Sequence, residues 1–305
     1  MRLEVKDIRK SFGEKEVLHG ISFQVESGRA LGLLGRNGAG KTTTIRILMD
    51  VFHANSGEIF FDGEKFIPSK HGIGYLPEER GLYPKRTVID QMIYLARLRG
   101  VHPSDAKANA RKWLERLEVA EYEKRKLETL SKGNQQKVQL ASTLVHNPEI
   151  VILDEPFSGL DPVNSQILKD VVNELIADNR LVIFSSHQMS YVEEFCDNIA
   201  IIDQGEVVLE GELREIKKEH GHNRLMLAAE NLDGGQLEEK LAGEFADLLR
   251  VCGRKKEFLI LELTGKAGRK QVMERLASSD IEVERFGSYA PSLNDIFVAK
   301  VGEES

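Results

Sequence analysis

The sequence predicts an α/β protein in two parts: a mixed sheet built around a phosphate-binding loop, followed by a small α+β unit of the ferredoxin-like type. Residues 35–42 read GRNGAGKT, between an apolar run and a helical pattern. Apolar strand patterns then alternate with helical patterns as far as residue 202, which is typical of a parallel sheet. Beyond residue 223 the patterns follow the order βαββαβ, which is that of a ferredoxin-like unit.

The elements of the first part follow from local patterns. Strand patterns at residues 3–8, 17–25 and 58–61, the last closed by an Asp-Gly turn, predict an antiparallel edge layer. Parallel strands are expected at residues 31–34, 73–76, 150–153, 181–184 and 199–202. Helices are expected at residues 87–99, 106–117 and 163–177, with a helical subdomain at about residues 80–147.

The second part follows a polar stretch at residues 211–223, which we interpret as a helix that runs into a linker. A boundary near residue 220 gives domains at 1–220 and 221–305. Strands are expected at 224–229, 248–252, 258–263 and 281–286, with helices at 235–242 and 269–277. The predicted core of this unit is Leu225, Leu227, Leu248, Val251, Leu259, Leu261, Leu263, Val272, Leu276 and Ile281.

Composition narrows the class of protein. The chain has 305 residues and a net charge of -7, so it lacks the basic balance expected of a primary nucleic-acid binder. Its first residues are too charged for a signal peptide, and no apolar run reaches the ~18 residues that span a bilayer. Cys196 and Cys252 lie far apart without ligand spacing, so we expect buried, unreactive thiols. A cytosolic protein is therefore expected.

The phosphate-binding (Walker A) loop predicts nucleotide binding. Its glycines let backbone N–H groups surround a polyphosphate at the positive end of the following helix. Lys41 is expected to reach the β- and γ-phosphates, and the Thr42 hydroxyl to bind Mg²⁺. A chance glycine-rich turn is the alternative, which the flanking strand and helix disfavour. The expected contacts are Gly35, Asn37, Gly38, Ala39, Gly40, Lys41, Thr42 and Thr43.

Two further motifs follow the loop. Asp154 and Glu155 follow a buried apolar strand. Asp154 is expected to hold the metal ion, and Glu155 to act as general base for the attacking water. The alternative is that both are ordinary surface acids at a strand end. Ser131 and Gly133, in Leu130–Lys137, predict a second anion site at a helix N-terminus. Without the other motifs, Ser131 could equally be a helix N-cap with no bound anion.

With these motifs in this order, roughly the first 215 residues resemble the ATP-binding subunits of ABC transporters, whose signature reads Leu-Ser-Gly-Gly-Gln. The resemblance implies that Phe12 stacks on adenine, that Asp161 is the D-loop acid, and that His187 is the switch histidine that contacts the γ-phosphate. Without it, Phe12 would read as a core aromatic at a strand end. Asp161 and His187 would read as turn or core residues.

The chain departs from the family pattern at two places. Glu78 stands where the family usually has glutamine; its carboxylate still suits Mg²⁺ but adds negative charge beside the γ-phosphate, so hydrolysis is expected to be slower or differently coupled. In the signature, Lys132 and Asn134 replace glycine and glutamine, while Ser131 and Gly133 are retained. Phosphate contact, in which we include Asn134, is expected to survive.

The resemblance also implies partners. ATP with Mg²⁺ would be held between this chain and a second ATP-binding subunit, in a homodimer or a related heterodimer. Separate multi-span membrane subunits would place the protein on the inner face of the cell membrane. Glu78 and the C-terminal segment look most like the exporter branch linked to drug, antibiotic or sodium efflux, whereas the substrate is not readable from this chain.

Two alternatives belong to other classes. One is a soluble ABC ATPase that acts on ribosomes or DNA, although this chain has neither a second head nor a long coiled-coil insertion. The other treats the C-terminal unit as an RNA-binding module. From residue 221 onward, 12 basic residues face 15 acidic ones and no aromatic strand motif occurs, so a regulatory or dimer-stabilising role is favoured.

Overall fold

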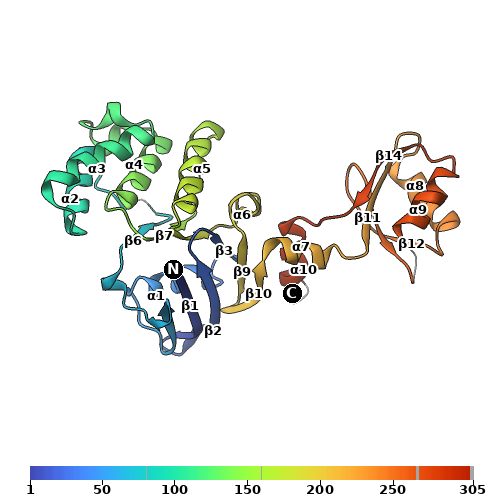
Figure 1. Cartoon of the computed structure of the whole chain (residues 1–305), viewed down its shortest axis with the longest axis horizontal. Helices are drawn as coiled ribbons and strands as arrows, with labels where there is room; N and C mark the ends of the chain where they lie inside the picture. Colours follow the sequence, from blue (N-terminus) through green and yellow to red (C-terminus); the bar gives the residue numbers. More distant parts are fainter. Residues whose placement is uncertain (80, 159, 266–267, 303–305) are drawn as a thin grey trace. The chain divides into compact units, whose positions relative to one another are not determined.

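The computed structural model describes residues 1–302 except 80, 159 and 266–267. Contacts within the chain define two compact units, Met1–Leu213 and a second unit that begins at Arg214. Each unit has its own sheet and core, so each is described by itself (Figure 1).

An antiparallel sheet forms the edge layer of the first unit. Its strand order is β2-β1-β4-β5, and the long hairpin β1–β2 pairs from Arg2↔Glu26 to Phe12↔Lys15. The predicted antiparallel layer is therefore confirmed, with longer strands than the apolar patterns indicated. The bounds are β1 Arg2–Phe12, β2 Lys15–Glu26, β4 Ser56–Phe61 and β5 Glu64–Lys65.

A six-stranded sheet carries the functional edge of this unit. Its order is β10-β9-β3-β8-β7-β6, parallel except for β10, which runs antiparallel to β9. The bounds are β3 Ala30–Leu34, β6 Ile73–Leu76, β7 Ile150–Asp154, β8 Leu181–Ser185, β9 Asn198–Asp203 and β10 Glu206–Glu212. Because β3 lies beside β8, and β8 beside β7, the segments that follow these strands meet at one edge.

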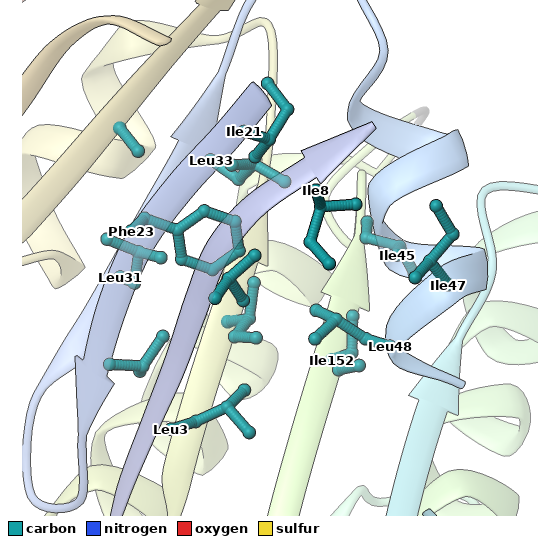
Figure 2. Packing of buried hydrophobic residues seen from close by; sticks show 14 of the residues in the cluster. Leu3, Ile8, Ile21, Phe23, Leu31, Leu33, Ile45, Ile47, Leu48 and Ile152 are labelled. Carbon is teal, nitrogen blue, oxygen red and sulfur yellow. The ribbon is translucent and has the colours of Figure 1, made fainter. Parts of the chain in front are cut away.

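The first unit has its main core between the two sheets. Side chains of β1 and β2 face those of β3 and β7, and helix α1, Lys41–Leu48, adds Ile45 and Leu48 (Figure 2). Ile8, Ile21 and Leu33 are at most 1% exposed. Burial of apolar surface stabilises the fold by ~25 cal/mol per Å². The buried side chains of β3 therefore hold the strand that precedes the phosphate loop in place.

Helices α2, α3 and α4 group together in the first unit (Figure 1). Side-chain caps mark their starts at Thr87, His102 and Ser131, and Asp161 caps α5. Helix α3 starts before its predicted residue because Pro103 occupies the first helical position. The bounds are α2 Val88–Leu98, α3 Pro103–Arg116, α4 Lys132–Leu144, α5 Pro162–Ala177 and α6 Met189–Phe195, with short 3-10 turns at Pro68–Lys70, Ala120–Tyr122 and Leu127–Thr129.

A four-stranded antiparallel sheet of order β12-β13-β11-β14 organises the second unit. This order, with the chain order βαββαβ, confirms the ferredoxin-like prediction. The bounds are β11 Arg224–Ala229, α8 Gly234–Glu244, β12 Leu249–Arg254, β13 Leu259–Leu263, α9 Arg269–Ala277 and β14 Val283–Ser288. Helices α7, Leu213–His220, and α10, Leu293–Gly302, flank this βαββαβ core in the sequence.

The core of the second unit contains the predicted leucines of the strands together with Leu237 and Leu241 of α8 and Phe245 directly after it, which the sequence-based list omitted. Val251 and Leu263 are only partly buried. The expectation of two buried thiols is wrong for Cys252, which is exposed on edge strand β12, whereas Cys196 is buried. Within the described residues, no helix is both long and apolar enough to cross a membrane.

Candidate nucleotide site

The phosphate loop joins β3 to α1 through glycines that no other residue replaces without strain. Gly35 has a φ of 153°, and a Cβ there would lie 2.2 Å from the carbonyl oxygen of Ile202. Gly40 caps α1 with a φ of 116°, and its Cβ would lie 2.6 Å from Leu18. Neighbouring strands therefore pack against the loop where it turns into the helix.

The Lys41 side chain lies inside the phosphate loop and bonds its backbone. Its side chain is 7% exposed, and its Nζ donates hydrogen bonds to the carbonyl oxygens of Gly35 at 2.8 Å and Arg36 at 3.1 Å. Burial lowers the pKa of Lys41, and the nearby carboxylates of Glu155, Asp154 and Glu78 oppose that decrease. The ammonium group thus lies among backbone oxygens and acids, in position to meet a phosphate.

Asp154 is held at the end of β7 by two hydroxyl donors. Ser185 Oγ donates to Oδ1 at 2.5 Å and the Tyr75 hydroxyl donates to Oδ2 at 3.3 Å. The carboxylate is 3% exposed, and burial raises the pKa of Asp154 while the Ser185 hydrogen bond opposes the rise. Burial also raises the pKa of Tyr75, to about 12. The orientation of Asp154 is therefore fixed by the two strands that flank β7.

Glu155 adopts a φ of 50°, a conformation that is uncommon for a residue with a side chain. Ser186 Oγ donates to its Oε2 at 3.1 Å, and both the backbone N–H and the ring Nδ1 of His187 contact Oε1 at 2.6 Å. Because an ionised carboxylate accepts hydrogen bonds but cannot donate them, we assign the proton of the His187 ring to Nδ1. The other ring nitrogen then donates to a phosphate only when the imidazole is protonated.

These segments enclose one cavity of about 220 Å³, lined by Asn37, Gly38, Gly40, Lys41, Thr42, Thr43, Glu78, Asp154 and Glu155. A hydroxyl and carboxylates are the protein ligands that Mg²⁺ usually takes, with nucleotide phosphates and water completing its shell. Thr42, Glu78 and Asp154 fit that chemistry. In the described part of the chain, no three His, Cys, Asp or Glu side chains cluster closely enough to hold a metal by themselves.

Other predicted site residues lie outside this cavity. Phe12 is 43% exposed and contacts Phe52 edge to face, with ring centroids 5.2 Å apart. Ser131 Oγ accepts a hydrogen bond from the backbone of Asn134 at 3.3 Å, and Asp161 caps α5. Of the residues described, those of the signature segment, Leu130–Lys137, do not line the cavity, and neither do Phe12 and Asp161.

Three supporting residues were missed from the sequence. Ser185 and Ser186 directly precede His187, so their position in the motif was a signal that they face the acid pair. Tyr75 gave no such signal, because its approach to Asp154 depends on the pairing of β6 with β7.

Comparison with known proteins agrees with these motifs. A family model described as ABC transporter matches residues 18–158, and one described as ATP-binding protein DrrA1-3-like, C-terminal domain, matches residues 211–301. An uncharacterized ABC transporter ATP-binding protein of Alkalihalophilus pseudofirmus is 44% identical, over 88% of this chain and 98% of its own. The linearmycin resistance ATP-binding protein LnrL of Bacillus subtilis is 37% identical, over 68% of each chain.

Solved structures share the fold of much of the chain. An ATP-binding subunit of an ABC transporter is 28% identical, with a TM-score of 0.66 over 79% of this chain and 98% of that chain. A dimeric bacterial ABC transporter cassette is 23% identical, with a TM-score of 0.63 over 70% and 99%. This chain belongs to the family of ABC transporter ATP-binding proteins, the ATPases of those transporters, and it carries the DrrA1-3-like C-terminal domain.

Proposed function

We propose that this ATPase powers export across a membrane, working as one of two paired heads on separate membrane subunits. The observation that carries the proposal is the single cavity that unites Lys41 of the phosphate loop with Glu78, Asp154 and Glu155. A cation facing buried acids at the end of a parallel sheet suits a polyphosphate with its metal. The relative LnrL is named for resistance to linearmycin, which supports the export direction.

Several side chains that line the cavity, and His187, which contacts Glu155 but is not part of the lining, have proposed roles. Lys41 binds the β- and γ-phosphates, and Thr42, Asp154 and Glu78 would hold Mg²⁺, which when bound would supply positive charge beside the phosphates. Glu155 accepts a proton from the attacking water. His187, bound to Glu155 at 2.6 Å, contacts the γ-phosphate once it is free to donate from its second nitrogen.

Pairing with a second head is supported by the position of the signature segment. Ser131, Gly133 and Asn134 do not line the cavity of their own chain, so their proposed phosphate contact requires another copy or a related subunit. In such a pair each nucleotide lies between the phosphate loop of one head and the signature segment of the other. Phe12, exposed on β1, is proposed to stack on adenine, and Asp161 to face the shared nucleotide.

A groove of about 470 Å³ is proposed as the contact with the membrane subunit. It lies between β6 and helices α2 and α4, and it is lined mainly by apolar surface, including Leu82, Leu95 and Leu98. Pro77 and Gly81, on either side of Glu78, also line it. An occupant of this groove would therefore touch the segment that carries a proposed metal ligand. Docking there would place the chain on the inner face of the membrane.

The substitution Glu155→Gln tests the hydrolytic role. Because glutamine cannot accept the proton from water, kcat should fall by about 10²–10⁴, while ATP binding is retained and the head pair accumulates with ATP inside. Glu149→Gln is a matched control, since Glu149 directly precedes β7 and contacts His71 at 2.7 Å instead. ATPase assays and sizing with ATP measure both effects. Near-parental hydrolysis by Glu155→Gln would show that another group is the base.

A further inference from the structure

Gly133 of the signature segment contacts a residue that lies 31 positions later in the sequence. A Cβ on Gly133 would lie 2.9 Å from the side-chain nitrogen of Asn164 and 3.7 Å from Leu160. Asn164 is in the first turn of α5, so the first turns of α4 and α5 touch at this point. Alanine in place of Gly133 would therefore displace the Asn164 amide, so the glycine makes room for Asn164 within this chain, in addition to any approach of a phosphate.

Asn164 is also bound on its other side. Its Nδ2 donates to Asp161 Oδ2 at 2.5 Å, and its backbone N–H donates to Asp161 Oδ1 at 2.9 Å. These bonds hold both oxygens of the Asp161 carboxylate, and they are the largest causes that lower the pKa of Asp161. One amide side chain thus fills the space between Gly133 and Asp161.

A second link ties the same helix to the acid pair. Gln136 Nε2, one turn along α4, donates to the carbonyl oxygen of Pro156 at 3.2 Å. The residue before Pro156 is Glu155, so the loop from the acid pair to α5 is hydrogen-bonded to α4 near its start, and near its end Asn164 lies against Gly133 of α4. With both links in place, the signature segment and Asp161 have a fixed relative position.

We propose that Asn164 is a positioning residue that holds Asp161 against the signature segment, so that both meet the partner head as one preformed surface. This inference rests on the proposed pairing of heads. Preformed surfaces lose less conformational entropy on association, so removal of the amide should weaken pairing and leave nucleotide binding within one head unchanged.

The test uses the full chain in the Glu155→Gln form, with ATP and Mg²⁺, and measures the dissociation constant of the head pair by analytical ultracentrifugation. Asn164→Ala should weaken pairing about fivefold or more, as expected for loss of a hydrogen bond to a charged group. Binding of a fluorescent ATP analogue below the pairing concentration should change less than about twofold. Gln166→Ala is the control, because Gln166 on the same helix bonds Asp170 instead, at 2.9 Å.

A double-mutant cycle separates positioning from direct contact with phosphate. Gly133→Ala should push the Asn164 amide off Asp161 and weaken pairing, whereas in the Asn164→Ala form the same change should weaken pairing less, because only the direct phosphate contact of Gly133 is then affected. Fully additive effects would overturn the proposal. Parental pairing by Asn164→Ala would also overturn it and leave head pairing intact. If the Glu155→Gln form without further substitutions did not form the head pair in the presence of ATP, the proposed pairing of heads would be overturned. The positioning role of Asn164 would then fall with it.

Discussion

Asp154 and Glu155 are 3% and 5% exposed, and both carboxylates accept hydrogen bonds from neighbouring groups of the chain. A buried charge without partners is costly, so these donors stabilise the acid pair. The donors to Glu155 come from the segment after β8, which includes His187.

At the residue scale, Glu78→Gln tests the clearest departure from the family pattern. The substitution removes a negative charge from the cavity that contains Lys41 and Asp154, while it keeps an oxygen that is able to bind metal. ATP affinity should stay within about tenfold, and kcat or its stimulation by the membrane subunit should change by about threefold or more. Steady-state ATPase assays with and without that subunit provide the measurement.

Glu79→Gln is the control for that substitution, because Glu79 is the adjacent residue and is not part of the cavity lining that the structure describes. If Glu78→Gln turned over ATP at the parental rate both alone and in complex, Glu78 would have no role in hydrolysis or coupling.

At the element scale, the segment between β6 and α2 connects the groove with the nucleotide cavity. Gln139 of α4 donates from Nε2 to the carbonyl oxygens of Pro77 and Glu79, each at 3.2 Å. These bonds fasten the backbone on both sides of Glu78 to the helical subdomain. A partner that shifts α4 or α2 would therefore move Glu78 relative to Asp154.

Leu98→Glu tests the groove as the contact with the membrane subunit. Leu98 ends α2 and is 64% exposed, so the substitution should leave folding and basal ATPase activity unchanged. Placing a charge in an apolar contact should weaken association by at least about tenfold. Association is measured in detergent with the proposed membrane subunit, which is to be sought among multi-span membrane proteins encoded by neighbouring genes. Met273→Glu, at a 56% exposed position of α9, is the control; equal binding by both variants would place the contact elsewhere.

At the scale of the whole molecule, the two units have separate cores. The core of the first unit surrounds β3 and α1, whereas that of the second joins β11 and β13 to α8 and α9. Every residue that lines the nucleotide cavity belongs to the first unit. We therefore propose that the first unit binds ATP by itself and that the second regulates or braces the head pair.

Truncation after Leu213 tests this division. The remaining head should bind ATP with an affinity within about twofold of the full chain, since no cavity residue and little of its core is removed. If the second unit braces the pair, the truncated Glu155→Gln form should pair more weakly with ATP, as measured by sizing. An insoluble head, or one that does not bind ATP, would mean that the two units form one continuous fold.

Helix and strand patterns predicted most elements of both units, and the exceptions have physical reasons. Strand β10 was not predicted, because its pairing depends on a tight turn in which Gln204 and Gly205 both have positive φ. Helix α10 was also missed. Its sequence, LNDIFVAKVG, has no clear alternation of apolar and polar faces, so only its tertiary contacts distinguish it from an irregular tail.

The phosphate loop, the acid pair and the ferredoxin-like order could be predicted from the sequence alone, because each depends on residues that are neighbours in the chain and on local backbone geometry. The folded structure was needed to show which distant groups meet: Tyr75 with Asp154, His187 with Glu155, and Asn164 with Gly133. The physical reason is that these contacts depend on strand register and on the packing of helix ends, neither of which has a local sequence pattern.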